Sequence, residues 1–337
     1  MNTKFLLNKL IDGNNLSEKE SSFILEGIID GQLTPMQSAA ILTALRTKGE
    51  TVEEIVGFIK TMRKHMIKIN APKALDIVGT GGDGIGTFNI STAASFVVAG
   101  LGVPIAKHGN RAASSKCGSA DVLEELGVKI FLTPKIAEKV FEKLGMVFLF
   151  APLYHPAMKL IAPVRKELGF RTIFNYLGPF LNPGQTKRQL LGVPNIEIAK
   201  RLAQVAAKLQ FTYLMIVTSS DNMDEITTTA KSEVFEIKEN KIKSFTLTPK
   251  QFGIKLATKK DLLGEGAKQN AAIIQNILKG QKGPQRDIVI LNSAAAFYLV
   301  GKAKNINEGI KLAEKSIDSG LAMQKLQNLI KETQKYA

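Results

Sequence analysis

The sequence has little cysteine and no long apolar run. Cys117 is the one cysteine in 337 residues, which excludes an internal disulfide and a zinc site built from cysteines, and fits a reducing compartment. No stretch of about 18 uninterrupted apolar residues is present, and residues 1–10 lack the charged start, apolar core and cleavage site of a secretory signal. Internal repeats and low-complexity tracts are also missing. We therefore expect a soluble cytoplasmic protein, stabilised by packing, that does not bind a membrane.

The charge of the chain is strongly one-sided. Lysine and arginine number 45 against 30 acidic residues, a formal charge of +15. Such a field suits nucleic acid, an anionic membrane or an anionic small substrate. Nucleic-acid surfaces usually concentrate their basic residues and include arginine or aromatic side chains, whereas the lysines here are spread along the whole chain. We therefore expect no nucleic-acid partner, and assign most of the charge to a lysine-rich composition and the rest to steering an anionic substrate.

The first 65 residues carry start and stop signals for helices. Three hydroxyl residues are each followed, three positions later, by an acid or amide, which is the pattern of a capping box. These pairs are Ser17 with Glu20, Thr34 with Gln37, and Thr51 with Glu54. Gly31 and Gly49 fall where the first two of these helices should end. We expect a small helical domain over residues 1–70.

From residue 74 onward, short apolar runs alternate with glycine-rich turns and helical stretches. This alternation predicts an α/β domain over residues 71–337 with a central, mainly parallel sheet. The predicted strands are residues 75–78, 104–106, 128–132, 146–150, 213–217 and 287–291, with helices at 91–101, 121–126 and 133–144 and a hairpin over 234–245 that turns at Glu239 and Asn240. Residues 154–194 are rich in Pro, Gly and Arg, with a helix at 158–168, and we expect the chain to cross between domains near residues 160–194.

A glycine-rich loop follows the first predicted strand. Residues 79–92 read GTGGDGIGTFNIST and lead into a helix. Glycines allow backbone N–H groups to gather round an anion, and a helix start adds hydroxyls and the positive end of a dipole. Gly79, Gly81 and Gly84 also fit the dinucleotide fingerprint, but the next strand ends in Lys107 and His108 where that fold needs an acid to bind ribose. The loop therefore predicts a phosphate site rather than an NAD site.

A second polar loop, residues 107–119 with the sequence KHGNRAASSKCGS, again precedes a predicted helix. Two strand–loop–helix units in series place both loops at the carboxyl edge of the sheet, where α/β proteins bind ligands. Two such loops suit a ligand with more than one phosphate. Cys117 lies in this basic loop, and because positive surroundings favour a thiolate, we expect its alkylation to slow a reaction at the site.

Eight short motifs fall between residues 79 and 179. They are GTGGD at 79–83, NIST at 89–92, KHGNR at 107–111, GSADVL at 118–123, HPAMK at 155–159, PVR at 163–165, RTIFN at 171–175 and LGP at 177–179. This set resembles the signature of the anthranilate phosphoribosyltransferase family. The resemblance implies a nucleoside-phosphorylase-like fold, a homodimer formed through the helical domain, and Mg²⁺-dependent transfer of the phosphoribosyl group from 5-phosphoribosyl 1-diphosphate to the amine of anthranilate, in tryptophan biosynthesis.

The resemblance also implies roles for individual residues. The diphosphate substrate would bind to Gly79, Gly82, Asp83, Thr87, Asn89, Ser91, Thr92, Lys107 and Ser119, and Mg²⁺ to Ser91, Asp224 and Glu225. Anthranilate would contact Gly79, Asn110, Arg165, His108 and His155, with Pro152 and Gly178 shaping its path. Two carboxylates suit Mg²⁺ alongside phosphate oxygens, and a guanidinium suits a carboxylate. No residue is assigned firmly to acid–base catalysis, and His108 is the candidate.

Two positions depart from the family pattern. Asn222 and Met223 precede the acid pair where glycine and leucine are usual, so a different turn is expected there, and Cys117 stands where a serine is usual. Two other functions remain open: a pyrimidine nucleoside phosphorylase, which shares the fold and uses free phosphate, and a nucleic-acid-binding protein of the same fold, which the +15 charge would suit. Asn110, Arg165 and the acid pair argue against both.

Overall fold

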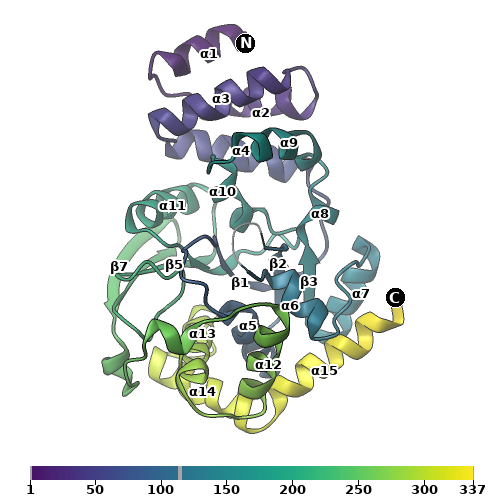
Figure 1. Ribbon diagram of the computed structural model, residues 1–337, viewed down its shortest axis with the longest axis vertical. Coiled ribbons are helices and arrows are strands. Elements are labelled where there is room, and N and C mark those ends of the chain that lie inside the picture. The colour runs from purple at the N-terminus through teal and green to yellow at the C-terminus, as the bar shows by residue number, and fades with distance from the viewer. Residues whose placement is uncertain (1, 113–115, 337) are drawn as a thin grey trace. The chain divides into compact units, whose positions relative to one another are not determined.

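The chain folds into two compact units. The structure is a computed structural model and describes residues 2–112 and 116–336. The helical unit comprises Met1–Ile67 and Pro152–Leu181, and the α/β unit comprises Lys68–Ala151 and Asn182–Ala337 (Figure 1). The sequence placed the crossing near residues 160–194. In the structure the segment that leaves the α/β unit for the helical unit is Pro152–Leu181, because the residues that follow lead back to strand β4 of the sheet.

Helices build the first unit. They are α1 (Thr3–Ile11), α2 (Glu18–Ile29), α3 (Pro35–Lys48), α4 (Val52–His65), α8 (Ala151–Tyr154, whose first residue belongs to the other unit), α9 (Met158–Leu168), α10 (Phe174–Leu177) and the short 3₁₀ helix η1 (Gly178–Leu181). All three predicted capping boxes are confirmed at the starts of α2, α3 and α4. Gly31 and Gly49 adopt φ values of +69° and +87° just beyond α2 and α3, as expected for glycine at a helix end.

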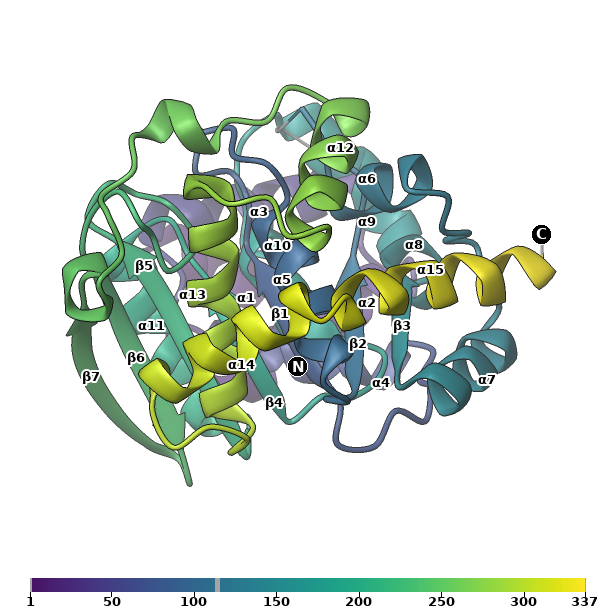
Figure 2. The same cartoon turned by 90° about the horizontal axis from the view of Figure 1, so that it is seen from below.

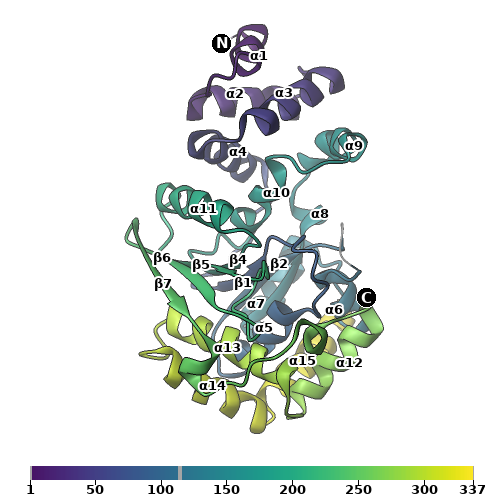
Figure 3. The same ribbon diagram turned by 60° about the vertical axis from the view of Figure 1, so that its left-hand side comes forward.

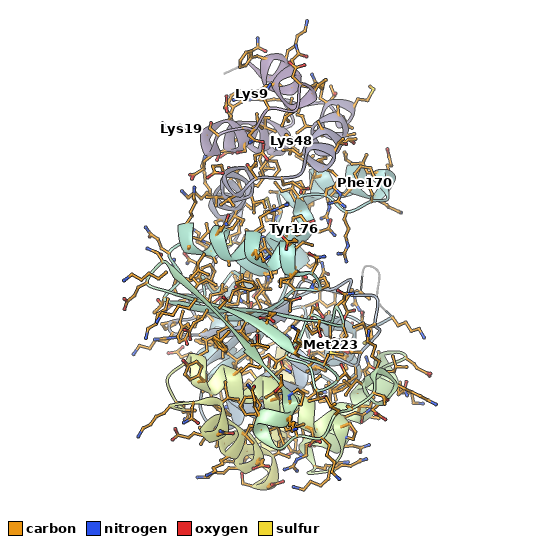
Figure 4. All side chains as sticks on the ribbon, turned by 90° about the vertical axis from the view of Figure 1, so that its left-hand side faces the viewer. Lys9, Lys19, Lys48, Phe170, Tyr176 and Met223 are labelled. Carbon is orange, nitrogen blue, oxygen red and sulfur yellow. The ribbon has the colours of Figure 1, made fainter. Side chains whose placement is uncertain are left out.

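The capping acid of α4 also ties the helical unit together. Glu54 is fully buried, and its carboxylate accepts hydrogen bonds from the backbone N–H groups of Thr51 (2.8 Å) and Leu16 (2.9 Å). Lys48, labelled in Figure 4, completes the group with its Nζ 3.0 Å from Glu54. A buried carboxylate is stable only when it is paired and hydrogen bonded, so this acid fixes the loop before α2 against the start of α4.

The α/β unit contains a seven-stranded sheet in the order β3-β2-β1-β4-β5-β6-β7. Its strands are β1 (Leu75–Gly79), β2 (Ile105–Gly109), β3 (Met146–Phe150), β4 (Arg188–Gly192), β5 (Tyr213–Ser219), β6 (Ser232–Lys238) and β7 (Lys241–Leu247). The first five pair in parallel, and β6 and β7 add an antiparallel hairpin. That hairpin turns at Glu239 and Asn240, both with positive φ, as a two-residue type I′ turn requires. The mainly parallel sheet and the hairpin are therefore confirmed.

Two predicted strands are wrong and one strand was missed. Residues 287–291 lie in helix α13 (Pro284–Leu299), which is buried on almost every side, so its sequence lost the helical period. Residues 128–132 alternate between buried and exposed, but their N–H groups bond to partners outside any strand, such as Thr333 Oγ1 for Lys129. Strand β4 was overlooked because it is short and lies between prolines 183 and 194.

Helices cover both faces of the sheet. They are α5 (Ile90–Gly100), α6 (Ser119–Glu125), α7 (Pro134–Leu144), α11 (Ile196–Lys208), α12 (Ala267–Leu278), α13, α14 (Ile306–Asp318) and α15 (Leu321–Thr333), with 3₁₀ turns η2 (Pro249–Phe252), η3 (Lys259–Leu262) and η4 (Gln334–Tyr336). Helix α11 lies on one face over β5 and β6, while α5 and α13 lie on the other with α14 and α15 outside them (Figures 2 and 3). The predicted α/β fold with a small helical domain is confirmed. Among the described residues, no helix combines the length and the apolar character that crossing a membrane requires.

Candidate active site

The strand order marks one edge of the sheet as the place for a ligand. From β1 the chain continues to β2 and β3 on one side, whereas β4 and β5 lie on the other side of β1. In α/β proteins ligands bind at the carboxyl ends of the strands where the order reverses in this way. Here that point lies between Gly79 and Gly192, the last paired residues of β1 and β4.

The glycine-rich loop begins at this point. Gly81, Gly82, Gly84 and Gly86 all adopt φ values between +70° and +77°, a region that glycine enters without strain. Several of the loop's N–H groups are already used within the protein: Thr80 donates to the carbonyl of Gly192 (2.9 Å), Gly81 to Asp224 Oδ2 (2.8 Å) and Ile85 to Asp83 Oδ1 (3.1 Å). In the described part of the chain the buried oxygens Thr80 Oγ1, Asp83 Oδ2 and Thr92 Oγ1 have no hydrogen-bond partner. The loop therefore retains polar atoms suited to a bound polar ligand.

The acid pair lies against the same two strand ends. A Cβ atom at Gly192 would lie 1.6 Å from the carbonyl oxygen of Asp224, and one at Gly79 would lie 2.5 Å from Asp224 Oδ2. Only glycine fits at Gly192, where the obstacle is backbone, and a Cβ atom at Gly79 would displace the carboxylate of Asp224. Asn222 adopts φ +68°, a left-handed conformation that asparagine tolerates better than most residues, and Met223 is fully buried (labelled in Figure 4). Glycine, which is usual here in the family pattern, favours the same conformation, and the expected difference in the turn stays a prediction.

Negative charge exceeds positive charge around this acid pair. Burial, followed by the charge of Asp83, raises the pKa of Asp224 to about 7, and burial with the charge of Asp224 raises the pKa of Glu225 well above its usual range. Lys107 opposes the rise for Glu225, while burial lowers the pKa of Lys107 itself. The described residues contain no group of three or more His, Cys, Asp or Glu side chains placed to hold a metal alone. Two carboxylates with an excess of negative charge fit Mg²⁺, which usually takes one or two carboxylates together with phosphate oxygens and waters.

The raised pKa values predict a pH dependence of stability in the metal-free protein. Folding raises the pKa of Asp224 from about 4 in the unfolded chain to about 7. A carboxyl group with such a raised pKa contributes its full stability below the unfolded pKa, and this contribution is lost as the pH rises through the folded pKa. In EDTA, the free energy of unfolding of the unmodified chain should therefore fall between about pH 4 and pH 7 relative to the Asp224→Asn/Glu225→Gln variant. Urea unfolding across this range measures both curves, and parallel curves would contradict the assignment.

Lys107 supplies the buried cation of the site. Its side chain extends from β2, and Nζ donates to the carbonyl of Ile77 (2.6 Å) and to Ser91 Oγ (3.2 Å) at the start of α5. Asp76, fully buried on β1, is the acid whose charge raises the pKa of Lys107 most, and it was not predicted from the sequence. Burial raises the pKa of Asp76 to about 6 against the opposing charge of Lys107. The charge of Glu225 also raises the pKa of Lys107. Ser91, Lys107 and Glu225 therefore lie close together in the structure.

The second loop is held by one carboxylate. Asp121 of α6 accepts hydrogen bonds from the backbone N–H groups of Ala112 (2.9 Å) and Gly118 (2.8 Å), and Arg111 Nη1 lies 3.0 Å from it. Residues 113–115 of the predicted loop lie outside the described residues. Asn110 is exposed, and its carbonyl accepts from the N–H of Ala120 and from Ser119 Oγ. Asp121 therefore fixes both ends of this loop, a role that its sequence position did not reveal.

His108 and Thr87 also belong to this edge of the α/β unit. His108 is buried on β2, and its backbone N–H donates to Asp76 Oδ1 (3.4 Å). Thr87 pairs with Leu263 in an isolated bridge, which places the segment after η3 beside the glycine-rich loop. The contact with Asp76 fixes the backbone of His108, and a catalytic role for its ring stays a prediction.

Cys117 differs from the expectation. Its side chain is buried, and burial, followed by the charge of Asp121, raises the pKa of the thiol to about 11. The expected thiolate is therefore wrong, because burial and a nearby carboxylate outweigh the basic residues of the loop. At pH 8 we expect iodoacetamide to label Cys117 about a hundredfold more slowly in the folded chain than in urea, since the fraction of thiolate falls in that proportion. Mass spectrometry over time measures both rates, and equal rates would contradict the burial of the thiol.

Four of the predicted residues belong to the helical unit: Pro152, His155, Arg165 and Gly178. Arg165 lies near the end of α9, with its guanidinium 5.4 Å from the ring centre of Phe174, and burial lowers its pKa. Phe174 in turn packs edge to face against Phe58 of α4, at 5.8 Å between ring centres. Burial also lowers the pKa of His155 to about 4, so this histidine is uncharged at neutral pH. Pro152 lies in α8, and Gly178 begins η1.

Comparisons with known proteins agree with this arrangement. The helical bundle domain of a glycosyl transferase family matches residues 4–66, and the a/b domain of a glycosyl transferase family matches residues 71–323. The chain is similar to the anthranilate phosphoribosyltransferase of Acetivibrio thermocellus, with 50% identity over 99% of this chain and 97% of that protein. It is also similar to that of Methanobrevibacter smithii, with 47% identity over 96% of this chain and 97% of that protein.

Solved structures give the same result. The anthranilate phosphoribosyltransferase of Thermus thermophilus has a TM-score of 0.90 and 39% identity, covering 97% of this chain and 99% of that one. The enzyme of Saccharomyces cerevisiae in complex with PRPP and Mg has a TM-score of 0.91 and 32% identity, covering 99% and 98%. The same yeast enzyme in complex with 4-fluoroanthranilate has a TM-score of 0.90 and 30% identity, again covering 99% and 98%. Identity at this level over nearly the full length shows that the chain belongs to the anthranilate phosphoribosyltransferase family.

Proposed function

We propose that this chain transfers the phosphoribosyl group of 5-phosphoribosyl 1-diphosphate to the amine of anthranilate and releases diphosphate, in tryptophan biosynthesis. One observation carries the proposal: a glycine-rich loop, two buried carboxylates and one buried lysine meet at the carboxyl ends of β1 and β4. Diphosphate needs cationic partners, and carboxylates can approach it only with a divalent cation between them. A magnesium diphosphate satisfies both requirements.

The residues of the α/β unit have distinct tasks in this proposal. Ser91, Asp224 and Glu225 hold Mg²⁺, which when bound offsets the negative charge of the diphosphate. Lys107, fixed by Ile77 and Ser91, adds the chain's own buried cation. The other residues proposed to bind this substrate are Gly79, Gly82, Asp83, Thr87, Asn89, Thr92 and Ser119. Together they stabilise the charge that develops as the bond from ribose C1 to the diphosphate oxygen breaks.

Anthranilate attacks C1 with the lone pair of its amine as the bond from C1 to the diphosphate oxygen breaks, and the amine then loses a proton to water. We assign no residue as a strong base, because positioning a neutral amine beside a departing diphosphate supplies much of the acceleration. Arg165 is proposed to bind the carboxylate of anthranilate, and half-burial strengthens such a pair compared with one in water. Gly79, Asn110, His108 and the uncharged His155 are proposed as further contacts of this substrate.

A homodimer formed through the helical unit is also part of the proposal, and the cytoplasm is the proposed compartment. Phe5 on α1 and Met36 on α3 are 64% and 82% exposed, and large exposed apolar side chains often mark a protein interface. We expect the Phe5→Asp/Met36→Asp variant to shift toward the monomer in light scattering. Phe131→Asp, a change at a 60% exposed residue of the α/β unit, is the control. Equal masses for all three proteins would contradict this interface.

Loss of anthranilate fluorescence provides the direct test of function. We expect a signal that requires both 5-phosphoribosyl 1-diphosphate and Mg²⁺ and that stops when EDTA is added. The alternative activity is tested in parallel with uridine or thymidine and inorganic phosphate, which a nucleoside phosphorylase would consume. Release of a free pyrimidine base without use of anthranilate would overturn the proposed function while leaving the fold assignment intact.

A further inference from the structure

Two asparagines are buried behind the proposed site. Asn270 of α12 is 1% exposed and Asn292 of α13 is fully buried. Asparagine is a poor helix former, and burying its amide costs free energy unless hydrogen bonds compensate for the lost water. Both amides are directed at loops of the site, Asn270 at residue 89 and Asn292 at residue 226. Their hydrogen bonds indicate what each one fixes.

Asn292 binds the peptide that follows the acid pair. Its Oδ1 accepts from the N–H of Ile226 (3.0 Å), and its Nδ2 donates to the carbonyl of Ile226 (2.9 Å) and to that of Ile288 in its own helix (2.9 Å). The side-chain amide thus pairs with both polar groups of one backbone residue, as a neighbouring strand would. Such a two-point contact fixes the position and the direction of the chain immediately after Glu225.

The acid pair is held from its other side by separate contacts. Ser219 Oγ accepts from the N–H of Met223 (2.7 Å), and the N–H of Ser219 donates to the carbonyl of Met223 (3.2 Å). Gly81 N–H donates to Asp224 Oδ2. Met223 and Ile226 therefore form two anchored ends, with the two carboxylates between them. Asn292 is the anchor on the carboxyl side, and it reaches the pair from a helix rather than from a neighbouring loop.

Asn270 acts on the glycine-rich loop instead. Its Nδ2 donates to Asn89 Oδ1 (2.9 Å), while Asn89 Nδ2 donates to the carbonyl of Cys117 (3.2 Å). With its oxygen held by Asn270, the amide of Asn89 has one N–H on Cys117 and a second N–H to donate. Gly264 makes room for this contact, because a Cβ atom there would lie 2.2 Å from Asn270 Oδ1.

We propose that Asn292 and Asn270 are positioning residues for the two halves of the site. Asn292 holds Asp224 and Glu225 in the arrangement that takes a divalent cation. Asn270 turns Asn89 so that its amide donates to a phosphate group. The identity of the phosphate substrate rests on the proposed function. The separate roles of the two asparagines, one for the acid pair and one for Asn89, do not.

Substitution by leucine tests each asparagine, because leucine keeps the size and removes the hydrogen bonds. We expect Asn292→Leu to weaken Mn²⁺ binding in the presence of saturating inorganic diphosphate about 10- to 100-fold, the usual effect of losing a group that supports metal ligands. Electron paramagnetic resonance of Mn²⁺ measures this without turnover. Asn270→Leu should change the affinity for Mn²⁺ by less than about threefold. The same variant should weaken binding of 5-phosphoribosyl 1-diphosphate about tenfold, measured by calorimetry at saturating Mg²⁺.

Each variant is the control for the other, and Val289→Ala, a cavity in the same helix as Asn292, controls for lost stability. Should either leucine variant fail to fold, Asn292→Asp and Asn270→Asp replace it, since each keeps the shape and removes the N–H donors. The proposal would be overturned if both leucine variants weakened the binding of Mn²⁺ and of 5-phosphoribosyl 1-diphosphate equally, or if Val289→Ala changed these affinities in the same way. The two asparagines would then have a structural role only. A wild-type chain that binds Mn²⁺ and diphosphate but ignores anthranilate would overturn only the proposed function.

Discussion

The Asp224→Ala/Glu225→Ala variant is expected to lose at least about a hundredfold in turnover, because each acid contributes to holding the cation that stabilises the departing diphosphate. Its fold should persist. Both carboxylates carry raised pKa values, so burial of their charges opposes folding and their removal does not remove a stabilising pair. Anthranilate fluorescence across a range of Mg²⁺ concentrations measures the turnover, and circular dichroism measures the fold.

A matched control separates this effect from a change in net charge. Glu142 on α7 and Glu314 on α14 are exposed acids, and the Glu142→Ala/Glu314→Ala variant has the same formal charge as the double variant of the site. It should keep full turnover. If the Asp224→Ala/Glu225→Ala variant retained the Mg²⁺ dependence of the unmodified chain, other residues would have to hold the ion.

Arg165→Ala is expected to raise the Michaelis constant for anthranilate roughly 10- to 150-fold, equivalent to about 1.5–3 kcal/mol for a lost charge-assisted hydrogen bond. The structure adds a reason for the choice of arginine. Its planar guanidinium lies over the ring of Phe174, which a lysine would not match, so Arg165→Lys should recover little of the loss. Steady-state kinetics with each substrate varied in turn measures the effect.

Lys166→Ala is the control for this prediction, since Lys166 is an exposed cation next to Arg165 on the same helix. It should leave both Michaelis constants unchanged. Arg165→Ala could instead lose affinity for 5-phosphoribosyl 1-diphosphate while its Michaelis constant for anthranilate is unchanged. That result would place Arg165 among the phosphate ligands and remove the main support for anthranilate as the acceptor.

Local signals in the sequence predicted local structure well. The capping boxes at Ser17, Thr34 and Thr51 and the turn at Glu239 depend on a few adjacent residues, and all of them formed as expected. The glycine-rich loop before a helix start was predicted correctly for the same reason. The strand predicted at residues 287–291 was wrong because a helix buried on almost every side has no polar stripe to reveal its period.

The supports of the site could not be predicted in this way. Asp76, Asn270 and Asn292 each act on a residue far away in the sequence, as Asn292 does on Ile226, and such pairs become visible only when the sheet and its helices are assembled. Asp224 and Glu225 alone look like an ordinary acidic pair. The family resemblance singled them out, and the contacts of Gly79 and Gly192 give the physical reason why they lie at the strand ends.

The single excursion of the chain out of the α/β unit affects the order in which the protein can fold during synthesis. Helices α2, α3 and α4 contact α9 and α10, which belong to the stretch Pro152–Leu181. At about 5–20 residues per second, the ribosome works for several seconds between Ile67 and that stretch. The first helices to emerge therefore cannot complete their unit until Pro152–Leu181 has been made, and their apolar surfaces are exposed to chaperones and to other nascent chains in the interval.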